Sequence, residues 1–170
     1  MSPLPDAEVL LARLIDRIRP DLTQATALVG IHTGGAWLAE RLHRQLGPVL
    51  PLGTLDVSFY RDDFDQTGLR PEVRRSNIPF EVEARHIILI DDVLYTGRTI
   101  RAAINELFDY GRPASVRLAT LVDRGGRELP IAADYVGASL ALPPDTMLVL
   151  VQDSEGKLGL DLHPRNLPKA

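Results

Sequence analysis

The segment from His86 to Thr99 constrains the fold of this chain more than any other. It begins with a strand of consecutive apolar residues, a pattern typical of strands buried on both faces in parallel sheets. Two adjacent carboxylates, Asp91 and Asp92, follow at once, and a Thr-Gly-Arg-Thr sequence then leads into a helical pattern over Thr99–Tyr110. A buried strand, a turn with small and hydroxylated residues, and a helix together predict one unit of an α/β fold.

The rest of the chain repeats this alternation. We expect a helix from Asp6, which can cap it, to about Arg19, a second helix over Ala36–Leu46, and strands over Ala27–Ile31, Pro51–Tyr60, His86–Ile90, Ser115–Val122, Tyr135–Val136, Met147–Val151 and Leu158–Leu162. The order predicts a single domain over residues 1–170 with a mostly parallel, doubly wound sheet flanked by helices. Ligand loops then lie at the carboxyl ends of the strands, where the turn His32–Gly35 and the segment Asp91–Thr99 stand.

The chemistry of the central segment suits a phosphorylated sugar. The hydroxyls of Thr96 and Thr99, with N–H groups at the start of a helix, form a cradle for an anion, and Gly97 permits a tight turn. Asp91 and Asp92 stand outside the cradle, where carboxylates can accept hydrogen bonds from sugar hydroxyls and stabilise positive charge on a ribose ring. The structural alternative is an acidic pair at a strand end followed by a threonine helix cap.

Composition excludes several classes of protein. The chain has no Cys, which excludes disulfides and thiolate metal sites, and no apolar run near the roughly 20 residues that span a bilayer. Its first residues lack the pattern of a signal peptide, so we expect a cytoplasmic protein without a membrane partner. The net charge of −4 argues against a dedicated nucleic-acid binder.

The run from Ile90 to Thr99 resembles the phosphoribosyl pyrophosphate (PRPP) motif of type I phosphoribosyltransferases. Other stretches are similar to one group of that family, the PyrR proteins, bifunctional pyrimidine operon regulators with uracil phosphoribosyltransferase activity: Leu55–Asp63, Ile78–Phe80, Gly111–Pro113, Leu121–Ile131 and Asp134–Gly137. The likeness implies a type I phosphoribosyltransferase fold with a flexible hood loop over about 61–79. It also implies transfer of a phosphoribosyl group from PRPP to uracil, which gives UMP and diphosphate, by a homodimer or homotetramer.

The resemblance assigns roles to individual residues. It implies that Asp91 and Asp92 are catalytic ribose ligands, and that the 5′-phosphate is bound by Val93, Leu94, Tyr95, Thr96, Gly97, Arg98 and Thr99. It further implies a pyrophosphate loop at Thr33, Gly34 and Gly35, hood cations at Arg61 and Arg74, and a base pocket with Arg124 and Leu148. Met147 is expected to be an ordinary core residue. The hard oxygens of PRPP imply Mg²⁺, held mainly by the substrate and not by a protein metal site.

One position departs from the pattern that the resemblance implies. An arginine is expected at the second position of the pyrophosphate loop, where this chain has Gly34. Without that cation the chain could be a catalytically weak or inactive nucleotide-sensing regulator. On that alternative, Gly34→Arg raises the transferase activity.

The resemblance also implies regulation of pyrimidine operons, through binding of leader mRNA that UMP or UTP controls. RNA requires a basic face. Two helical groups could contribute to one: Arg13, Arg17 and Arg19, and Arg41, His43 and Arg44. The alternative for both groups is an ordinary solvated helix face.

Overall fold

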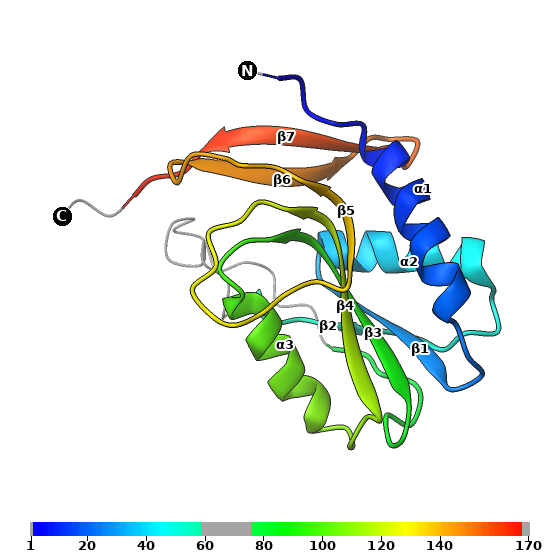
Figure 1. Ribbon diagram of the computed structural model, residues 1–170. Helices are drawn as coiled ribbons and strands as arrows, with labels where there is room; N and C mark the ends of the chain where they lie inside the picture. Colours follow the sequence, from blue (N-terminus) through cyan, green and yellow to red (C-terminus); the bar gives the residue numbers. More distant parts are fainter. Residues whose placement is uncertain (1, 59–75, 168–170) are drawn as a thin grey trace.

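The computed structural model describes residues 2–58 and 76–167 and is built around a five-stranded parallel sheet with the strand order β2-β1-β3-β4-β5 (Figure 1). A separate antiparallel hairpin, β6-β7, completes the strands. The elements are α1 (Ala7–Ile18), η1 (Arg19–Asp21), β1 (Thr26–Ile31), α2 (Gly34–Leu46), β2 (Leu52–Leu55), β3 (His86–Leu94), α3 (Arg98–Phe108), β4 (Ser115–Asp123), β5 (Tyr135–Ser139), β6 (Thr146–Gln152) and β7 (Leu158–Pro164). The predicted α/β class with a mostly parallel, doubly wound sheet is confirmed.

Both faces of the sheet are covered, which explains why its strands read as continuous apolar runs. Leu28 and Ile88 point toward a core shared with α1, α2 and the β6-β7 hairpin. Their neighbours Val29 and Leu89 point the other way, into a core shared with α3. Figure 1 shows α3 on the opposite side of the sheet from α1 and α2. No helix among the described residues is long and apolar enough to cross a membrane.

Most element boundaries fall within a few residues of their predicted positions. Asp6 caps α1, because its Oδ1 accepts a hydrogen bond of 2.8 Å from the Glu8 N–H. The strand predicted over Pro51–Tyr60 is wrong in length, since β2 ends at Leu55. The carboxylate of Asp56 ends it by accepting hydrogen bonds from the N–H and the hydroxyl of Ser58, which turns the chain.

The central strand is longer than predicted, and this extension positions the acidic pair. β3 continues past Ile90 to Leu94 and stays paired with β4 throughout, whereas its pairing with β1 ends at Ile90. The chain proceeds from β1 to β2 on one side and from β3 to β4 on the other. The gap between β1 and β3 is therefore the point where the winding reverses, the place at which open α/β sheets bind ligands.

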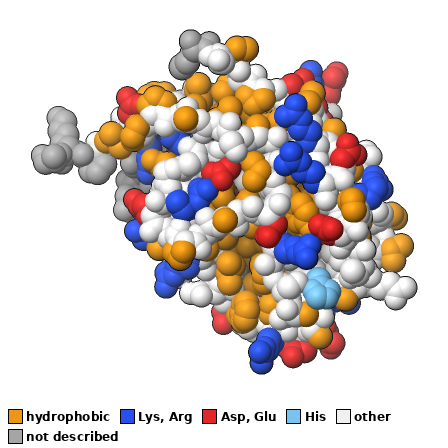
Figure 2. All heavy atoms as spheres, in the orientation of Figure 1, with side chains coloured by type: hydrophobic (Ala, Val, Ile, Leu, Met, Phe, Trp, Pro, Cys, Tyr) orange, Lys and Arg blue, Asp and Glu red, His pale blue; other side chains and the backbone are white. Residues whose placement is uncertain are grey.

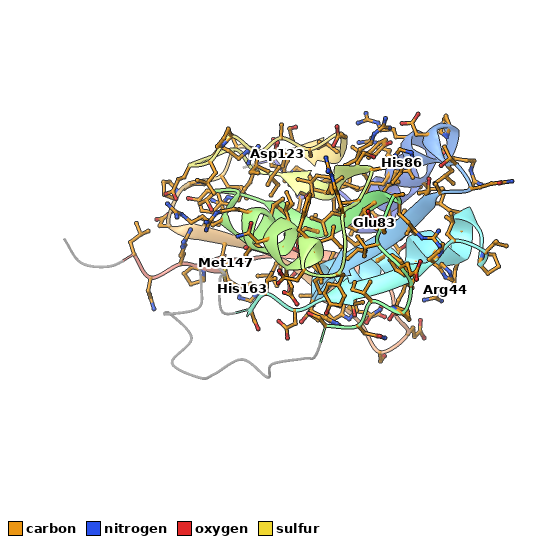
Figure 3. All side chains as sticks on the ribbon, turned by 90° about the horizontal axis from the view of Figure 1, so that it is seen from below. Arg44, Glu83, His86, Asp123, Met147 and His163 are labelled. Carbon is orange, nitrogen blue, oxygen red and sulfur yellow. The ribbon has the colours of Figure 1, made fainter. Side chains whose placement is uncertain are left out.

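The β6-β7 hairpin lies at the carboxyl end of the sheet, next to β3. Figure 3 shows Met147 and His163 side by side on its two strands, where they are paired, and Arg44 on the other side of the molecule. The hairpin turn predicted at Asp153–Gly156 is present between the strands, closed by the Asp153 N–H bond to the Lys157 carbonyl. The hairpin supplies a wall beside the residues that follow Ile90.

Candidate active site

The acidic pair is held by its own backbone. Asp91 is 3% exposed, and its Oδ1 accepts a hydrogen bond of 2.9 Å from the Asp92 N–H. The Oδ1 of Asp92 accepts one of 2.8 Å from the Val93 N–H, and the hydroxyl of buried Thr120 donates to the Asp92 carbonyl. These bonds fix the orientation of the two carboxylates before any ligand arrives.

The predicted phosphate cradle forms the start of α3. Gly97 is the residue before the helix and has φ +94°, in the left-handed region that glycine adopts at little cost. The hydroxyl of Thr96, which is 4% exposed, accepts a hydrogen bond of 3.2 Å from the Arg98 N–H. Because Gly97 has no side chain to cap the helix, the first-turn N–H groups and the positive end of the helix dipole are presented to an anion.

The segment from Asp123 to Ile131 braces this cradle, a role that the sequence did not reveal. The Thr96 carbonyl accepts from the N–H groups of Glu128 and Leu129. Arg127 donates to the carbonyls of Tyr95 and Ile131 and forms an ion pair of 2.7 Å with Asp123. The guanidinium fork of a single arginine therefore ties the two segments together.

Arg98 contributes to the cradle differently from its prediction. Its guanidinium forms an exposed ion pair of 2.8 Å with Glu128, which lies in the bracing segment Asp123–Ile131. Only the backbone N–H of Arg98 faces the Thr96 hydroxyl. The role predicted for Arg98 in binding the 5′-phosphate stays a prediction.

The turn predicted as the pyrophosphate loop packs directly on the acidic pair. A Cβ atom built on Gly34 would lie 2.3 Å from Oδ2 of Asp92, and one on Gly35 would lie 2.4 Å from the Ile90 carbonyl oxygen. Thr33 precedes them as the residue before α2 and is half-buried. A side chain at position 34 would require Asp92 or the turn to shift. The expectation that Gly34→Arg raises the transferase activity stays a prediction, and this steric contact argues against it.

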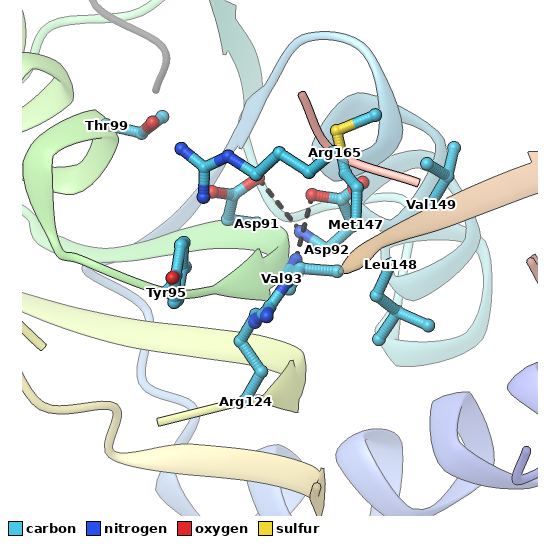
Figure 4. Close-up of a pocket in the computed structure, with 10 residues that line it drawn as sticks. All are labelled: Asp91, Asp92, Val93, Tyr95, Thr99, Arg124, Met147, Leu148, Val149 and Arg165. Atoms are coloured by element: carbon cyan, nitrogen blue, oxygen red, sulfur yellow. Dashed lines mark hydrogen bonds between the residues drawn. The ribbon is translucent and has the colours of Figure 1, made fainter. Parts of the chain in front are cut away.

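One cavity of about 250 Å³ collects half of the predicted site residues that the structure describes (Figure 4). Its lining includes the predicted Asp91, Asp92, Val93, Tyr95, Thr99, Arg124 and Leu148, together with Met147, Val149 and Arg165. Leu94, Thr96, Gly97 and the turn at 33–35 adjoin it without lining it. The expectation that Met147 is a core residue is wrong: it is half-exposed and lines the cavity.

Arg124 is 5% exposed and stacks on the ring of Tyr95, with 4.1 Å from its Cζ to the ring centre. Its two terminal nitrogens donate to the carbonyls of Thr146, at 2.6 Å, and Pro143, at 2.9 Å. Burial lowers the pKa of the guanidinium, while the Tyr95 side chain acts in the opposite direction. Arg124 thus shapes the wall of the cavity by holding the loop before β6.

The hood predictions fall largely beyond the described structure. Arg61 and Arg74 lie outside the described residues. The chain returns from there at Ser76, whose hydroxyl accepts from the Asp56 N–H and donates to Glu106 on α3. Asn77 then exchanges two backbone hydrogen bonds of 2.8 Å with Thr54 on β2. The returning end of the predicted hood is therefore anchored to the body of the protein.

Among the described residues, no three His, Cys, Asp or Glu side chains converge as a metal site would require. The carboxylates of Asp91 and Asp92 are hard oxygen donors beside the cavity, and they suit Mg²⁺ as a minority of its ligands. The residues present thus fit a Mg²⁺ ion that a phosphorylated ligand carries.

The arginines predicted for an RNA face are partly engaged within the protein. Arg17 donates to the Val136 carbonyl, Arg19 to the Gln45 carbonyl, and Arg41 forms a 2.6 Å ion pair with Glu8. Arg13 and Arg44 are exposed, and His43 is half-buried. On the face shown in Figure 2, basic and acidic side chains are interspersed and do not form a continuous basic field.

Comparisons with known proteins identify the family. Residues 4–146 match the phosphoribosyl transferase domain family. The chain is 57% identical over 152 residues to the bifunctional protein PyrR of Pseudomonas aeruginosa, covering 87% of this chain and 89% of the relative. It is 61% identical over 126 residues to that of Nitrosococcus oceani, covering 73% and 71%.

Solved structures show the same fold. A hypoxanthine phosphoribosyltransferase of Staphylococcus aureus has a TM-score of 0.65 at 23% identity, over 85% of this chain and 79% of that one. A purine phosphoribosyltransferase of Pyrococcus horikoshii has a TM-score of 0.61 at 24% identity, over 78% and 81%. The sheet, the acidic pair, the cradle and these comparisons lead to one conclusion: the chain belongs to the phosphoribosyl transferase domain family and, within it, to the PyrR proteins.

Proposed function

We propose that this protein transfers the 5-phosphoribosyl group of PRPP to uracil, forming UMP and diphosphate. The observation that carries the proposal is that one cavity is bounded by the acidic pair, the start of α3 and an apolar wall of Met147, Leu148 and Val149. Ribose, phosphate and a flat base each find a matching surface there. The membership in the PyrR proteins, whose resemblance implies uracil as the acceptor, supports the choice of a pyrimidine base.

Each surface has a task in the reaction. The cradle at residues 96–99 holds the 5′-phosphate, and the backbone of the turn at 33–35 faces the pyrophosphate. Uracil N1 forms a bond to the anomeric carbon as the bond from that carbon to pyrophosphate breaks, and the electron pair leaves on the pyrophosphate oxygen. The N1 proton passes to solvent. Asp91 and Asp92 hold the ribose and stabilise the positive charge that develops on its ring.

Mg²⁺ would be held mainly by PRPP and water, with Asp91 and Asp92 as the protein oxygens nearest to it. When bound, it neutralises charge on the pyrophosphate and so makes it a better leaving group. The hood cations Arg61 and Arg74 are proposed to meet the same charge. Because Mg²⁺ neutralises the pyrophosphate charge, we expect the assay to require Mg²⁺.

A direct assay tests the proposal. Purified protein with PRPP, Mg²⁺ and uracil should form UMP, with hypoxanthine and guanine as inert comparison bases. Asp92→Asn should lower the rate by about 100-fold, because a positioned charge is lost from the transition state. Asp16→Asn, an exposed change on α1, is the matched control. Tight UMP binding without any turnover would instead support the alternative of an inactive nucleotide-sensing regulator. We favour that alternative less, because the acidic pair and the phosphate cradle are both intact.

The second function that we assign is regulation of pyrimidine biosynthesis operons, through UMP- or UTP-dependent binding of leader mRNA. Exposed Arg13 on α1 and Arg44 on α2 are the described candidates for RNA contacts. A labelled leader RNA should bind more tightly with UMP, and its affinity should fall with salt as phosphate contacts require. A scrambled RNA of equal length that binds equally well would refute specific regulation.

We assign this function to a cytoplasmic homodimer or homotetramer. The assignment rests on the resemblance to PyrR proteins. Light scattering at micromolar concentration measures the mass directly. A mass near the 18.7 kDa of one chain would contradict the assignment.

A further inference from the structure

Arg165 reaches the cavity from the end of the chain that follows β7. Its position is fixed at the backbone, where the Arg165 N–H donates to the Asp145 carbonyl at 2.6 Å and the preceding Pro164 pairs with Thr146. The side chain is half-buried and lines the cavity. Figure 4 shows its guanidinium over the carboxylate of Asp91, on the side of the cavity where Thr99 stands. A segment remote in sequence from the PRPP motif thus places a cation between the ribose and phosphate surfaces.

The described lining of the cavity contains two cations, Arg124 and Arg165. Arg124 directs both terminal nitrogens to carbonyls of the loop at 143–146, so its fork is committed to the protein. Arg165 lies 5.2 Å from the ring centre of Tyr95, the same ring on which Arg124 stacks. The positive charge of Arg165 lowers the pKa of Arg124, in addition to the larger effect of burial. Two like charges this close favour an anionic ligand, because the ligand offsets their repulsion.

The turn at 33–35 cannot provide such a cation. Its residues are Thr33, Gly34 and Gly35, and the space where a side chain of Gly34 would begin is filled by Asp92. Two carboxylates line the cavity, and a ligand with several phosphate charges adds to their negative charge. A guanidinium whose planar fork matches phosphate oxygens is the side chain suited to balance that charge.

We infer that Arg165 binds a phosphate group of the sugar donor and is a substrate-binding residue that the sequence pattern of the family motif does not include. The inference rests on the proposed function, since it takes PRPP as the ligand of the cavity. The 5′-phosphate and the pyrophosphate share the chemistry that Arg165 recognises. Ribose 5-phosphate and inorganic pyrophosphate, titrated separately, distinguish them.

The experiment compares full-length wild type with Arg165→Gln, Arg165→Lys and Arg112→Gln by calorimetric titration in the presence of Mg²⁺. Arg112 is exposed between α3 and β4, at the amino end of the strands and away from the cavity, and its substitution makes the same change of charge. We expect Arg165→Gln to raise the Kd for at least one of the two ligands by about 10- to 100-fold, as loss of a charged hydrogen bond does. Lysine should recover part of the affinity, because it keeps the charge without the fork. Arg112→Gln should leave both constants within about twofold of wild type.

Several outcomes would overturn the assignment. Arg165→Gln that binds both ligands within about twofold of wild type would refute it. So would an unchanged affinity for both ligands with a raised KM for uracil, since Arg165 would then contact the base. A wild type that binds neither ligand and forms no UMP would refute the proposed function itself. Equal melting temperatures of the variants, within about 2 °C, ensure that folding is not the cause.

Discussion

Gly34 and Asp92 occupy the same small volume: a Cβ atom on Gly34 would lie 2.3 Å from Oδ2 and 2.8 Å from Cγ of Asp92. The two residues come from different elements, the start of α2 and the carboxyl-terminal part of β3. The observed position of the Asp92 carboxylate therefore requires that residue 34 has no side chain. Gly34 is a steric requirement of the site and not simply the loss of a cation.

Gly34→Ala and Gly34→Arg should both lower kcat/KM for PRPP, by about 100-fold, because they displace a carboxylate from its working position. Steady-state kinetics with UMP detection measure the effect. Gly159→Ala on β7 is the control, since its Cβ would meet Val151 at an ordinary 3.4 Å. An arginine variant as active as wild type would show that the turn, and not Asp92, adjusts.

Arg127→Leu should weaken PRPP binding by about 10-fold and lower the free energy of unfolding by about 2–3 kcal/mol. The reason is that three partners of a partly buried guanidinium, Asp123 and the carbonyls of Tyr95 and Ile131, lose their hydrogen bonds at once. Arg112→Gln is the matched control, because Arg112 is exposed on the loop between α3 and β4 and does not line the cavity. Chemical denaturation and ligand titration give the two quantities. Equal losses of unfolding free energy and of PRPP affinity in both variants would mean that the bracing segment Asp123–Ile131 does not depend on Arg127.

The sequence revealed the local parts of this fold better than their assembly. Periodicity and capping placed α1 and α3 within a few residues, and the apolar run at 87–90 identified the central strand because both faces of it are buried. The extension of β3 to Leu94 was not predicted. The two aspartates at 91 and 92 interrupt the apolar run, and the strand conformation beyond Ile90 comes from pairing with β4.

The parts of the site that were missed are those created by tertiary contacts. Arg165 stands in a stretch with no motif, and only the β6-β7 pairing carries it to the cavity. The ring of Tyr95, predicted within the phosphate loop, instead stacks with Arg124. Local sequence chemistry therefore identified the anion cradle, whereas the walls around it required the three-dimensional arrangement.

Glu8 predicts a pH dependence of stability. Its carboxylate accepts from Arg41, at 2.6 and 3.1 Å, and from the Leu158 N–H at 2.9 Å, and so joins α1, α2 and β7. The hydrogen bond with Arg41 lowers the pKa of Glu8 below its ordinary value of 4.5, against the opposing effect of burial. A lowered pKa in the folded state means that the stabilisation is complete above the unfolded pKa and is lost as the pH falls through the folded one.

Glu8→Gln should therefore cost about 1–2 kcal/mol of unfolding free energy at pH 7, and the cost should shrink as the pH falls below 4.5 toward the lowered pKa. Urea denaturation at pH 7, 5 and 3.5 gives the three values. Glu40→Gln, an exposed change on α2, should cost nothing measurable at any of them. A cost of Glu8→Gln that stays constant with pH would mean that the charge of Glu8 does not stabilise the fold.

Leu148 and Leu150 offer a matched pair that separates the base pocket from the core. They stand two residues apart on β6, are 5% and 4% exposed, and belong to the same apolar cluster, but of the two only Leu148 lines the cavity. Each leucine-to-alanine change should lower the unfolding free energy by about 2–4 kcal/mol. Only Leu148→Ala should also raise the KM for uracil, by about 10-fold, because only there does the apolar wall lose contact with the base. Equal KM values in the two variants, measured at a temperature where both stay folded, would remove Leu148 from the base pocket and leave it as a core residue.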